Sequence, residues 1–494
     1  MKRFLTSGSI YGKLMLLVGI LVSVPLLVLP FYRAETKYTL AFLAPAAFSI
    51  IIGFIIIALT YTRNYDSNDS EWHTPVQKGS IPVMFAWCYG IILGAVPFVI
   101  GNQLGIVCAL FESVSGWTTT GLSVVSDVMA MPRIFLLHRS FMQCSGGLGF
   151  ILMMVMFVQN KQVMNLYSAE GHADMIRPNL RRTARVIFGI YCGFHVIGIT
   201  MYRVFGMELF DAICHTMAAL STAGFTTQAS SIGAYDSFPI ELITTVLMLI
   251  GASNFAVLFL LAELKMKQVF KVTEMRFMLG LVAVFVPLSV FSLFISTDLN
   301  VLSSLRQALF GVVTTFSTTG FSTMDYSLWP PFALGLIMLL MIIGGSSGST
   351  AGGIKLSRAY FVLRITHENI RKRFSPARKV SAPGYYTVRG RAAIDDSLIA
   401  DTFGFIACYL GLFVIGSLLL TLTSGYSLFD TMYEFASAFG TVGISNGLTG
   451  AGQNAATLLI LMVGMLLGRL EIFIVFIGIA SSMKLLLYRK QKTR

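Results

Sequence analysis

The sequence predicts an all-α polytopic membrane protein, in which four pseudo-repeated units follow an N-terminal hairpin of two helices. Three observations predict this fold class. Of the 494 residues, 55% are hydrophobic and only 12% are charged, whereas a soluble domain carries about 25% charged residues. Apolar runs of about 20 residues, long enough to span a bilayer, recur along the chain. One six-residue pattern is found four times. Together these observations argue strongly against a water-soluble enzyme.

Ten apolar segments have the length that a membrane-spanning helix requires. We expect spans at roughly 14–32, 40–60, 81–101, 134–158, 186–205, 238–262, 277–296, 332–362, 398–423 and 455–487. Four semi-apolar stretches have only about 12 residues each, and a helix of that length measures about 18 Å, so it can enter the membrane but not cross it. These short stretches lie at about 106–117, 209–220, 305–316 and 428–439.

The distribution of charge supports this count of spans. In a soluble protein the net charge of +13 would suggest a nucleic-acid partner. With ten spans, both termini lie on one side of the membrane, and that side receives 29 of the 36 Lys and Arg residues. The positive-inside rule makes it the cytoplasmic side. The other seven are Arg33, Lys37, Arg133, Arg139, Arg203, Arg306 and Arg469. We therefore expect a lipid bilayer around the chain and no nucleic acid.

A six-residue segment follows each short stretch. The four copies read T-T-T-G-L-S at Thr118–Ser123, S-T-A-G-F-T at Ser221–Thr226, S-T-T-G-F-S at Ser317–Ser322 and G-T-V-G-I-S at Gly440–Ser445. The fourth residue is always glycine, and such self-similarity predicts a repeated architecture. Each unit is then a span, a short helix, the six-residue segment and a second span. We expect the hairpin at 1–75 and the units at 76–165, 166–265, 266–375 and 376–494.

Acidic residues precede the glycines and suggest the direction of the short helices. Asp211 and Asp430 stand thirteen residues before the glycine of their units, and Glu112 and Glu434 stand nine residues before theirs. An acidic residue at a helix N-terminus suits the positive end of the helix dipole. The negative end, with its free carbonyls, would then point to the membrane centre. That arrangement favours a cation.

The six-residue segments can supply the ligands for such a cation. Extended backbone inside a membrane is tolerated only where it is buried or lines a water-filled path. Carbonyls turned toward one axis can replace the hydration shell of an ion, and glycine permits the backbone dihedrals that this requires. We therefore predict four span–pore helix–filter–span units around one central pore. The alternative is four ordinary extracellular turns.

The filter segments also carry a resemblance. T-V-G-I-S in unit four resembles the T-V-G-Y-G filter of potassium channels, and the whole chain resembles the superfamily of K+ transporters that contains the Trk, Ktr and plant HKT proteins. The N-terminal hairpin is similar to that of the bacterial TrkH branch. The resemblance implies a potassium uptake protein with one pore in each subunit. It also implies a multi-pass protein of the bacterial inner membrane, and we expect both termini in the cytoplasm.

The resemblance assigns roles to the filter residues. It implies a selectivity filter formed by Thr118, Thr119, Thr120, Gly121, Ser221, Thr222, Ala223, Gly224, Ser317, Thr318, Thr319, Gly320, Gly440, Thr441, Val442 and Gly443. The K+ ion, as the transported cargo, would be bound by the backbone carbonyls of Thr119, Thr120, Thr222, Ala223, Thr318, Thr319, Thr441 and Val442. Glycine at all four positions implies a preference for K+ over Na+.

Each span that follows a filter is interrupted by small residues. The small residues in unit one (145–150) and unit two (251–255) are compatible with ordinary helix packing through glycine. In unit three, ten small residues lie within a long apolar stretch. As one continuous helix this stretch would measure about 46 Å, which is more than a bilayer requires. We expect a broken helix with a mobile loop, and the resemblance implies that the loop is a gate beneath the filter. A structural kink is the alternative. The loop residues are Gly344, Gly345, Ser346, Ser347, Gly348, Ser349, Thr350, Ala351, Gly352 and Gly353.

Arg469 is expected well inside the second span of unit four. A charged side chain at such a depth costs at least about 2.5–3.5 kcal/mol. Below a cation filter its fixed positive charge would raise the barrier to ions, and the resemblance implies that it obstructs the path together with the loop. The alternative is that Arg469 pairs with Glu112 or Glu434 and braces the pore helices.

The sequence also bears on the partners of the chain and on other classes of function. The cytoplasmic segments are short and carry no nucleotide-binding motif, so no nucleotide is expected on this chain. The resemblance implies a homodimer and a cytoplasmic TrkA-type regulatory subunit that binds NAD or ATP. A secondary transporter would use paired repeats, and a membrane-embedded enzyme would need a catalytic cluster; the four filters favour a pore and no enzyme. A Na+-permeable or proton-coupled cation symporter of the same fold remains as the alternative.

Overall fold

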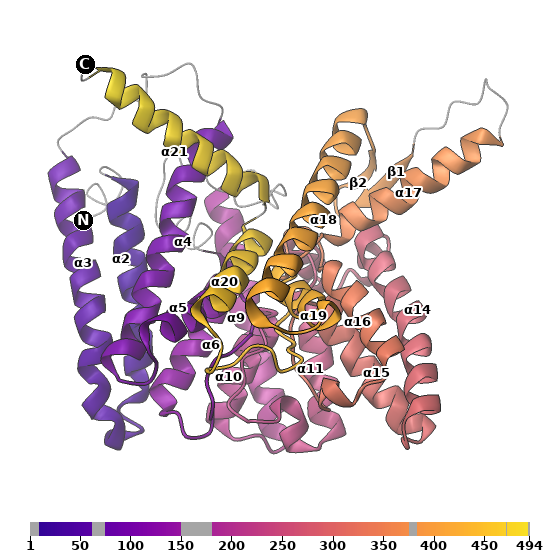
Figure 1. The fold of residues 1–494 in the computed structure, drawn as a ribbon, viewed down its shortest axis with the longest axis horizontal. Coiled ribbons are helices and arrows are strands. Elements are labelled where there is room, and N and C mark those ends of the chain that lie inside the picture. Colours follow the sequence, from indigo (N-terminus) through magenta and orange to yellow (C-terminus); the bar gives the residue numbers. More distant parts are fainter. Residues whose placement is uncertain (1–8, 62–74, 150–179, 375–382, 471, 493–494) are drawn as a thin grey trace.

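The protein is described by a computed structural model that covers residues 9–61, 75–149, 180–374, 383–470 and 472–492. It confirms the all-α polytopic membrane class, because its elements are almost all helices and many of them are apolar (Figure 1). Within the described residues, the strands form one antiparallel hairpin. Strand β1 (Gly384–Thr387) pairs with β2 (Gly390–Ala393).

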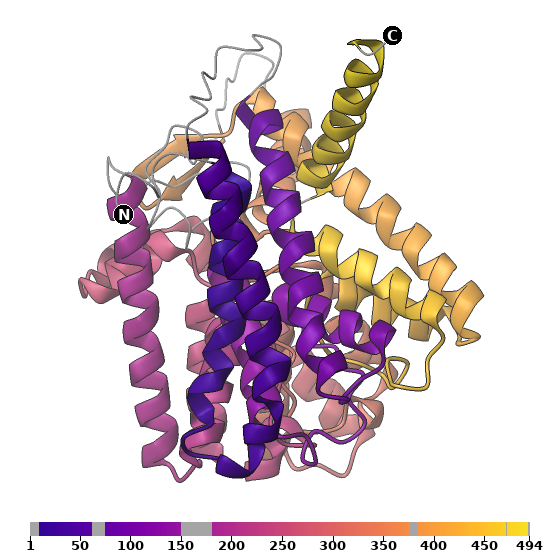
Figure 2. The same ribbon diagram turned by 90° about the vertical axis from the view of Figure 1, so that its left-hand side faces the viewer.

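The N-terminal hairpin consists of two long helices that lie side by side (Figure 2). Helix α2 (Ile10–Ser23) continues as the 3-10 turn η1 (Val24–Val28), and α3 (Thr39–Tyr61) follows the turn η2 (Arg33–Tyr38). Their backbones approach closely at two glycines, since a Cβ added to Gly53 would lie 2.7 Å from the carbonyl oxygen of Gly12. Small residues permit this close packing of helices in a membrane.

Each repeated unit contains a first helix, a short pore helix and a second helix. Unit one has α4 (Pro75–Ile100), α5 (Ile106–Trp117) and α6 (Arg133–Leu148). Unit two has α9 (Leu180–Val204), α10 (Leu209–Leu220), η3 (Ser231–Tyr235), α11 (Phe238–Gly251) and α12 (Phe255–Ala262). Unit three has α13 (Met266–Val269), α14 (Thr273–Ser296), α15 (Val301–Phe316), η4 (Tyr326–Leu328), α16 (Pro331–Ile342) and α17 (Leu356–Arg373). Unit four has α18 (Asp396–Ser424), α19 (Leu428–Phe439), α20 (Ala455–Arg469) and α21 (Ile472–Lys492).

The four units form a closed ring. The second helix of each unit packs against the pore helix of the next, so that α6 contacts α10, α11 contacts α15, α16 contacts α19 and α20 contacts α5. The last of these contacts joins unit four to unit one. The pore helices and the segments that follow them are thereby brought to the centre of the molecule (Figure 1).

The ten predicted spans are not all single straight helices in the described part of the chain. Six described helices are long and apolar enough to cross a membrane, or up to eight if each bent pair is one span. The predicted span 332–362 is divided into α16 and α17, as the small residues between them suggested. The predicted span 134–158 is described only as α6, because its residues 150–158 lie outside the described part of the chain.

The break in unit two is a sharp bend, which the interpretation of its small residues as a packing surface did not include, although Gly251 does pack against the backbone of Leu220. Helices α11 and α12 meet at 118°, and α20 and α21 meet at 101°. Asn254 explains the new start at α12, because its side chain accepts a hydrogen bond from the backbone N–H of Ala256 and caps the helix. The bend turns the backbone of 252–254 toward the centre, where it becomes part of the site described below.

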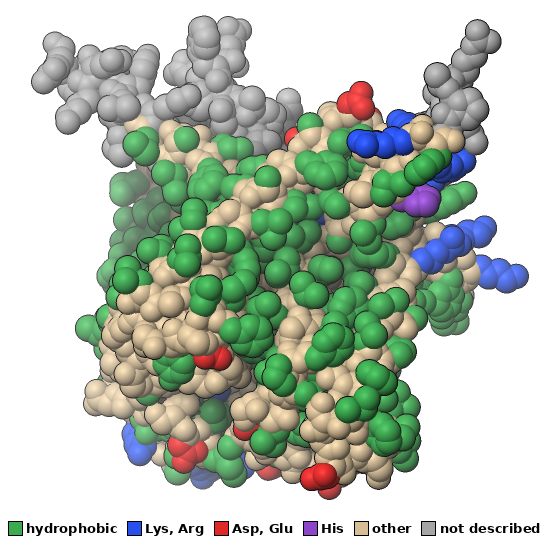
Figure 3. Space-filling model, turned by 45° about the vertical axis from the view of Figure 1, so that its right-hand side comes forward, with side chains coloured by type: hydrophobic (Ala, Val, Ile, Leu, Met, Phe, Trp, Pro, Cys, Tyr) green, Lys and Arg blue, Asp and Glu red, His purple; other side chains and the backbone are tan. Residues whose placement is uncertain are grey.

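The outer surface carries many large apolar side chains, as contact with lipid requires. Leu27, Leu59, Phe291 and Leu422 are each more than 60% exposed. Figure 3 shows hydrophobic side chains across the middle of one face, while charged side chains lie toward its upper and lower edges. A soluble monomer rarely exposes so large an apolar surface.

Candidate functional site

The four pore helices end in the same hydrogen-bonded cap. In α5 the backbone N–H of Thr119 donates to the carbonyl of Gly116, and that of Thr120 donates to Ser115. These two bonds define a Schellman motif, whose C′ residue adopts a left-handed conformation. The same pair of bonds is donated at the ends of α10, α15 and α19 by Thr222 and Ala223, Thr318 and Thr319, and Thr441 and Val442.

The left-handed residue of every cap is a threonine. Thr119, Thr222, Thr318 and Thr441 have φ values of 55°, 51°, 57° and 53°. Glycine is the usual residue here, and a side chain held in this region costs about 1–3 kcal/mol. All four threonines are fully buried. The repetition of this strain at one level indicates that their side chains do more than terminate a helix.

Each filter glycine touches the filter segment of the next unit. Gly121, Gly224, Gly320 and Gly443 have φ values of 97°, 77°, 80° and 89°. A Cβ added to Gly121 would clash with the carbonyl oxygen of Ala223, the residue before the glycine of unit two. The other three glycines make the corresponding contacts around the ring. A Cβ on Gly224 would clash with the carbonyl oxygen of Thr319, one on Gly320 with that of Val442, and one on Gly443 with that of Thr120.

The glycine contacts therefore place four backbone carbonyls in one closed ring. Its members are Thr120, Ala223, Thr319 and Val442. Neutral oxygens arranged in this way can replace the hydration shell of a cation. A side chain on any of the four glycines would enter the ring, and the positive φ would strain it further.

A polar residue of each pore helix holds the chain just beyond the filter. The hydroxyl of Ser123 donates to Glu112 at 3.1 Å, and that of Ser445 donates to Glu434 at 2.8 Å. In units two and three, Thr227 donates to Asp211 and Thr323 to Gln307. Asp211 and Asp430 lie in the first turns of their helices as expected. Glu112 and Glu434 do not, since each is the seventh residue of a 12-residue helix.

A buried ion pair within unit one reaches the edge of unit two at this level. Arg139 donates to Glu112 at 2.6 Å, and both side chains are almost inaccessible. The guanidinium also donates to the Ser123 hydroxyl and lies 4.1 Å from the ring centre of Phe225. Removal of either partner would leave a buried charge uncompensated, which is strongly destabilising. The pair braces the filter from outside.

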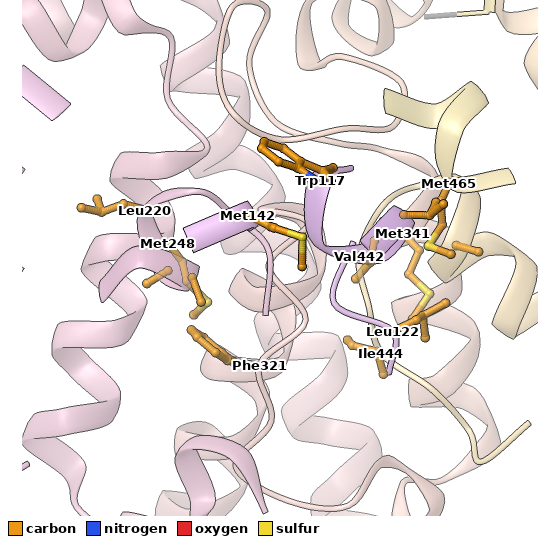
Figure 4. Packing of buried hydrophobic residues seen from close by; sticks show 14 of the residues in the cluster. Trp117, Leu122, Met142, Leu220, Met248, Phe321, Met341, Val442, Ile444 and Met465 are labelled. Carbon is orange, nitrogen blue, oxygen red and sulfur yellow. The ribbon is translucent and has the colours of Figure 1, made fainter. Parts of the chain in front are cut away.

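Apolar side chains pack around the filter backbone (Figure 4). Trp117, Leu122, Val442 and Ile444 are each at most 3% exposed and belong to the main hydrophobic core. Close packing of this kind leaves the backbone little freedom to move. The positions of the ring carbonyls are therefore set by the core and by the caps together.

The predicted gate residues form a mostly buried loop between α16 and α17. The N–H of Gly344 donates to Ile354 at 2.9 Å, which closes the neck of the loop. The N–H of Ser346 donates to the carbonyl of Ala252, and that of Phe255 donates to Gly348. The bend between α11 and α12 thus provides the backbone groups on which the loop of unit three docks.

The loop lies directly beneath the filter threonines. The hydroxyl of Thr350 is 3.0 Å from that of Thr222, and the N–H of Gly352 donates to the hydroxyl of Thr318 at 3.2 Å. A Cβ added to Gly352 would clash with the hydroxyl of Thr441. The loop therefore contacts three of the four cap threonines. Within the described residues, the hydroxyls of Thr119 and Thr441 have no hydrogen-bond partner.

Arg469 connects the loop to unit one. It is the last residue of α20, beside the bend to α21, and so does not lie well inside a helix as expected. Its guanidinium donates to the carbonyl of Thr350 in the loop, to that of Gly146 at 2.7 Å and to that of Gly147 at 3.3 Å. The expected alternative partner Glu112 is bound by Arg139 instead.

The predicted filter and gate residues thus meet at one place, although they come from all four units. Sequence reasoning did not find Arg139, the docking role of 252–254, or the hydroxyls that bind the loop. Asn254, a residue type that favours the N-cap, stands three residues after Gly251 and was the available signal for the bend. No comparable local signal paired Arg139 with a glutamate 27 residues away.

Comparisons with known proteins agree on one family. The family model for TrkH, described as a cation transport protein, matches residues 47–485. The Trk system potassium uptake protein TrkH of Halomonas elongata is 29% identical over 445 residues, which cover 87% of this chain and 90% of that protein. The Trk system potassium uptake protein TrkG of Escherichia coli is 27% identical over 463 residues, covering 89% and 94%. The crystal structure of the potassium transporter TrkH from Vibrio parahaemolyticus matches with a TM-score of 0.81 and 26% identity, over 96% of this chain and 98% of that one.

Proposed function

The chain belongs to the TrkH family of cation transport proteins, and we propose that it takes up potassium ions across the membrane through one selective pore in each subunit. The main support is the closed ring of backbone carbonyls from Thr120, Ala223, Thr319 and Val442, with a glycine beside each. Relatives over most of the chain are named potassium uptake proteins. Transport, and not catalysis, is the proposed activity.

The ring favours K+ over Na+ in this proposal. A ring of carbonyl oxygens must match the energy of the hydration shell that the ion loses. The positive φ values of the four glycines and the clash that any side chain would make support a backbone held at one spacing. The filter of the proposal comprises the four segments 118–121, 221–224, 317–320 and 440–443.

We further propose that the loop 344–353 and Arg469 close the pore beneath the filter. Support comes from the contacts of the loop with three filter threonines and from the hydrogen bonds that Arg469 makes to the loop and to α6. Arg469 adds a positive charge on the inner side of a cation path, where it raises the barrier to ions. Release of the loop would open the path.

We also propose the membrane and the partner proteins in which this chain works. We place it in a bacterial inner membrane with both termini in the cytoplasm, as a homodimer controlled by a TrkA-type subunit that binds NAD or ATP. The start of α2 and the end of α21 lie toward the same side of the molecule (Figure 1). A basic cytoplasmic face, including Arg371, Lys372 and Arg373 at the end of α17, suits an acidic partner surface.

Uptake experiments test the proposal. Cells that lack their own K+ uptake systems should grow at low K+ when they express the chain, and liposomes that contain the purified protein should accumulate K+. Failure of both, with well-folded protein present, would contradict the function. Dependence of K+ flux on a proton gradient would favour the proton-coupled alternative, and equal fluxes of Na+ and K+ would favour the Na+-permeable one.

A further inference from the structure

Gln143 on α6 holds the filter segment of unit two from behind. Its side-chain nitrogen donates to the carbonyl of Ala223 at 2.7 Å, and its side-chain oxygen accepts from the backbone N–H of Phe225 at 3.3 Å. The two bonds fix the orientation of the amide, because the carbonyl needs a donor and the N–H needs an acceptor. Gln143 is fully buried. It therefore spans Gly224 and binds the backbone on both sides of it.

Units two and four carry methionine at the equivalent position. The second helix of units one, two and four has a glycine that lies against the last carbonyl of its own pore helix: Gly146 against Trp117, Gly251 against Leu220 and Gly468 against Phe439. Three residues before these glycines stand Gln143, Met248 and Met465. In unit three Met341 stands three residues before Gly344 in the sequence, although Gly344 lies against Gly352 of the loop. All three methionines are fully buried (Figure 4).

The residue that Gln143 contacts is also different. Before the filter glycines stand Thr120, Ala223, Thr319 and Val442, so unit two has the smallest side chain. A β-branched side chain can be held by packing, whereas alanine offers only a methyl group. The structure combines the one polar second-helix residue with the one alanine. Hydrogen bonds from Gln143 replace the packing that the filter of unit two lacks.

We propose that Gln143 is a positioning residue for ion selection, which fixes the distance and direction of the Ala223 carbonyl in the ring. The inference rests on the proposed function and deepens it. The bound amide also withdraws part of the electron density of this carbonyl, so unit two contributes a weaker ligand than its three counterparts. Selection between K+ and Na+ depends on the number and strength of such ligands.

Substitution to methionine provides the test, since units two and four show that methionine fits this position. Gln143→Met removes both hydrogen bonds while nearly conserving volume. In liposomes with the full-length protein, we expect the ratio of K+ to Na+ influx to fall roughly threefold to tenfold, the effect of losing the bond to the ring carbonyl of Ala223, while K+ influx at saturating K+ stays near that of the wild type. Met248→Leu is the matched control, because it changes the equivalent apolar residue of unit two and should leave the ratio unchanged.

Gln143→Glu is the second variant, and it keeps size and polarity. It retains an acceptor for Phe225 but, when ionised, has no donor for Ala223. We expect a lower ratio here too. A wild-type ratio in both variants would overturn the inference, as would a loss of thermal stability with the ratio unaltered. If the wild-type protein itself carries no K+, the proposed function fails, whereas active wild-type protein with unaltered variants rejects only the role of Gln143.

Discussion

The filter and the level directly beneath it are built by the same four units but differ in symmetry. At the filter, every unit contributes a capped pore helix, a left-handed threonine and a glycine against the next carbonyl. Beneath it the contributions differ: unit three supplies the loop 344–353, unit two the bend on which it docks, unit four Arg469, and unit one the carbonyls that Arg469 binds. A spherical ion is matched by equivalent ligands, whereas a closure requires one part that can be held or released.

The largest effect is expected from breaking the symmetric level. In Gly121→Ser the new Cβ would clash with the carbonyl of Ala223, and φ of 97° would strain the residue further. We expect the ratio of K+ to Na+ influx in liposomes to fall by at least about tenfold, which corresponds to about 1.4 kcal/mol. Gly105→Ser is the matched control, since nothing lies within 4 Å of a Cβ there. Equal ratios in the two variants would argue against the filter.

A shorter gate loop should act on the asymmetric level alone. Removal of Ser346–Ala351 deletes the hydroxyl that approaches Thr222 and the main acceptor that Arg469 binds in the loop. We expect K+ influx to increase several-fold, with little change in its ratio to Na+. Reduced or unchanged influx through well-expressed protein would favour a structural kink.

Arg469→Ala tests the contribution of unit four to the same closure. It removes a positive charge from the level beneath the filter, together with the hydrogen bonds to Thr350 and Gly146. We expect a rise in K+ influx of a few-fold with selectivity retained. Arg469→Lys keeps the charge but not the planar fork of donors. It therefore distinguishes the effect of the positive charge from the effect of the hydrogen bonds. An unfolded alanine variant would support a brace instead.

The smallest effect is expected at one hydroxyl of the loop. Thr350→Val conserves shape but loses the donor to the carbonyl of Gly251 and the contact with Thr222. Loss of one neutral hydrogen bond amounts to about 1 kcal/mol, so we expect influx to rise about twofold to fivefold. Ser349→Ala serves as the control, because its hydroxyl binds Ser346 within the loop. A larger increase in the control than in Thr350→Val would contradict the docking role.

The repeated level was largely predictable from the sequence, and the reason is physical. The pore helices have 12 residues, or 16 in α15, which begins four residues before the predicted stretch, and both lengths are too short to cross a membrane. A glycine follows each at a fixed distance, so span, pore helix and filter could be assigned from length and composition. The left-handed threonines could not, because glycine is the residue that signals this cap. From the sequence alone, Thr119 would be assigned to an ordinary extended segment.

The level beneath the filter was predictable only in part. The small residues of 344–353 were evident, but what they contact depends on bends in other units. Gly251 and Ala252 read as a packing surface, since glycine is common in membrane helices, yet they are the groups that bind the loop. The position of Arg469 at a helix end was likewise hidden by the apolar residues on both sides of it.

The closure of the ring between units one and four has a consequence for biogenesis. The hydrogen bond from Arg469 to Gly146 joins residues 323 positions apart, and the contact of Gly443 with Thr120 spans the same distance in the chain. Neither can form before unit four has been synthesised and inserted. Until then the filter has an open side, with buried carbonyls and hydroxyls lacking their final neighbours. Contacts between such distant segments form slowly. Truncation before the segment 440–443 therefore leaves the whole proposed filter open, and does not remove only one of its four walls.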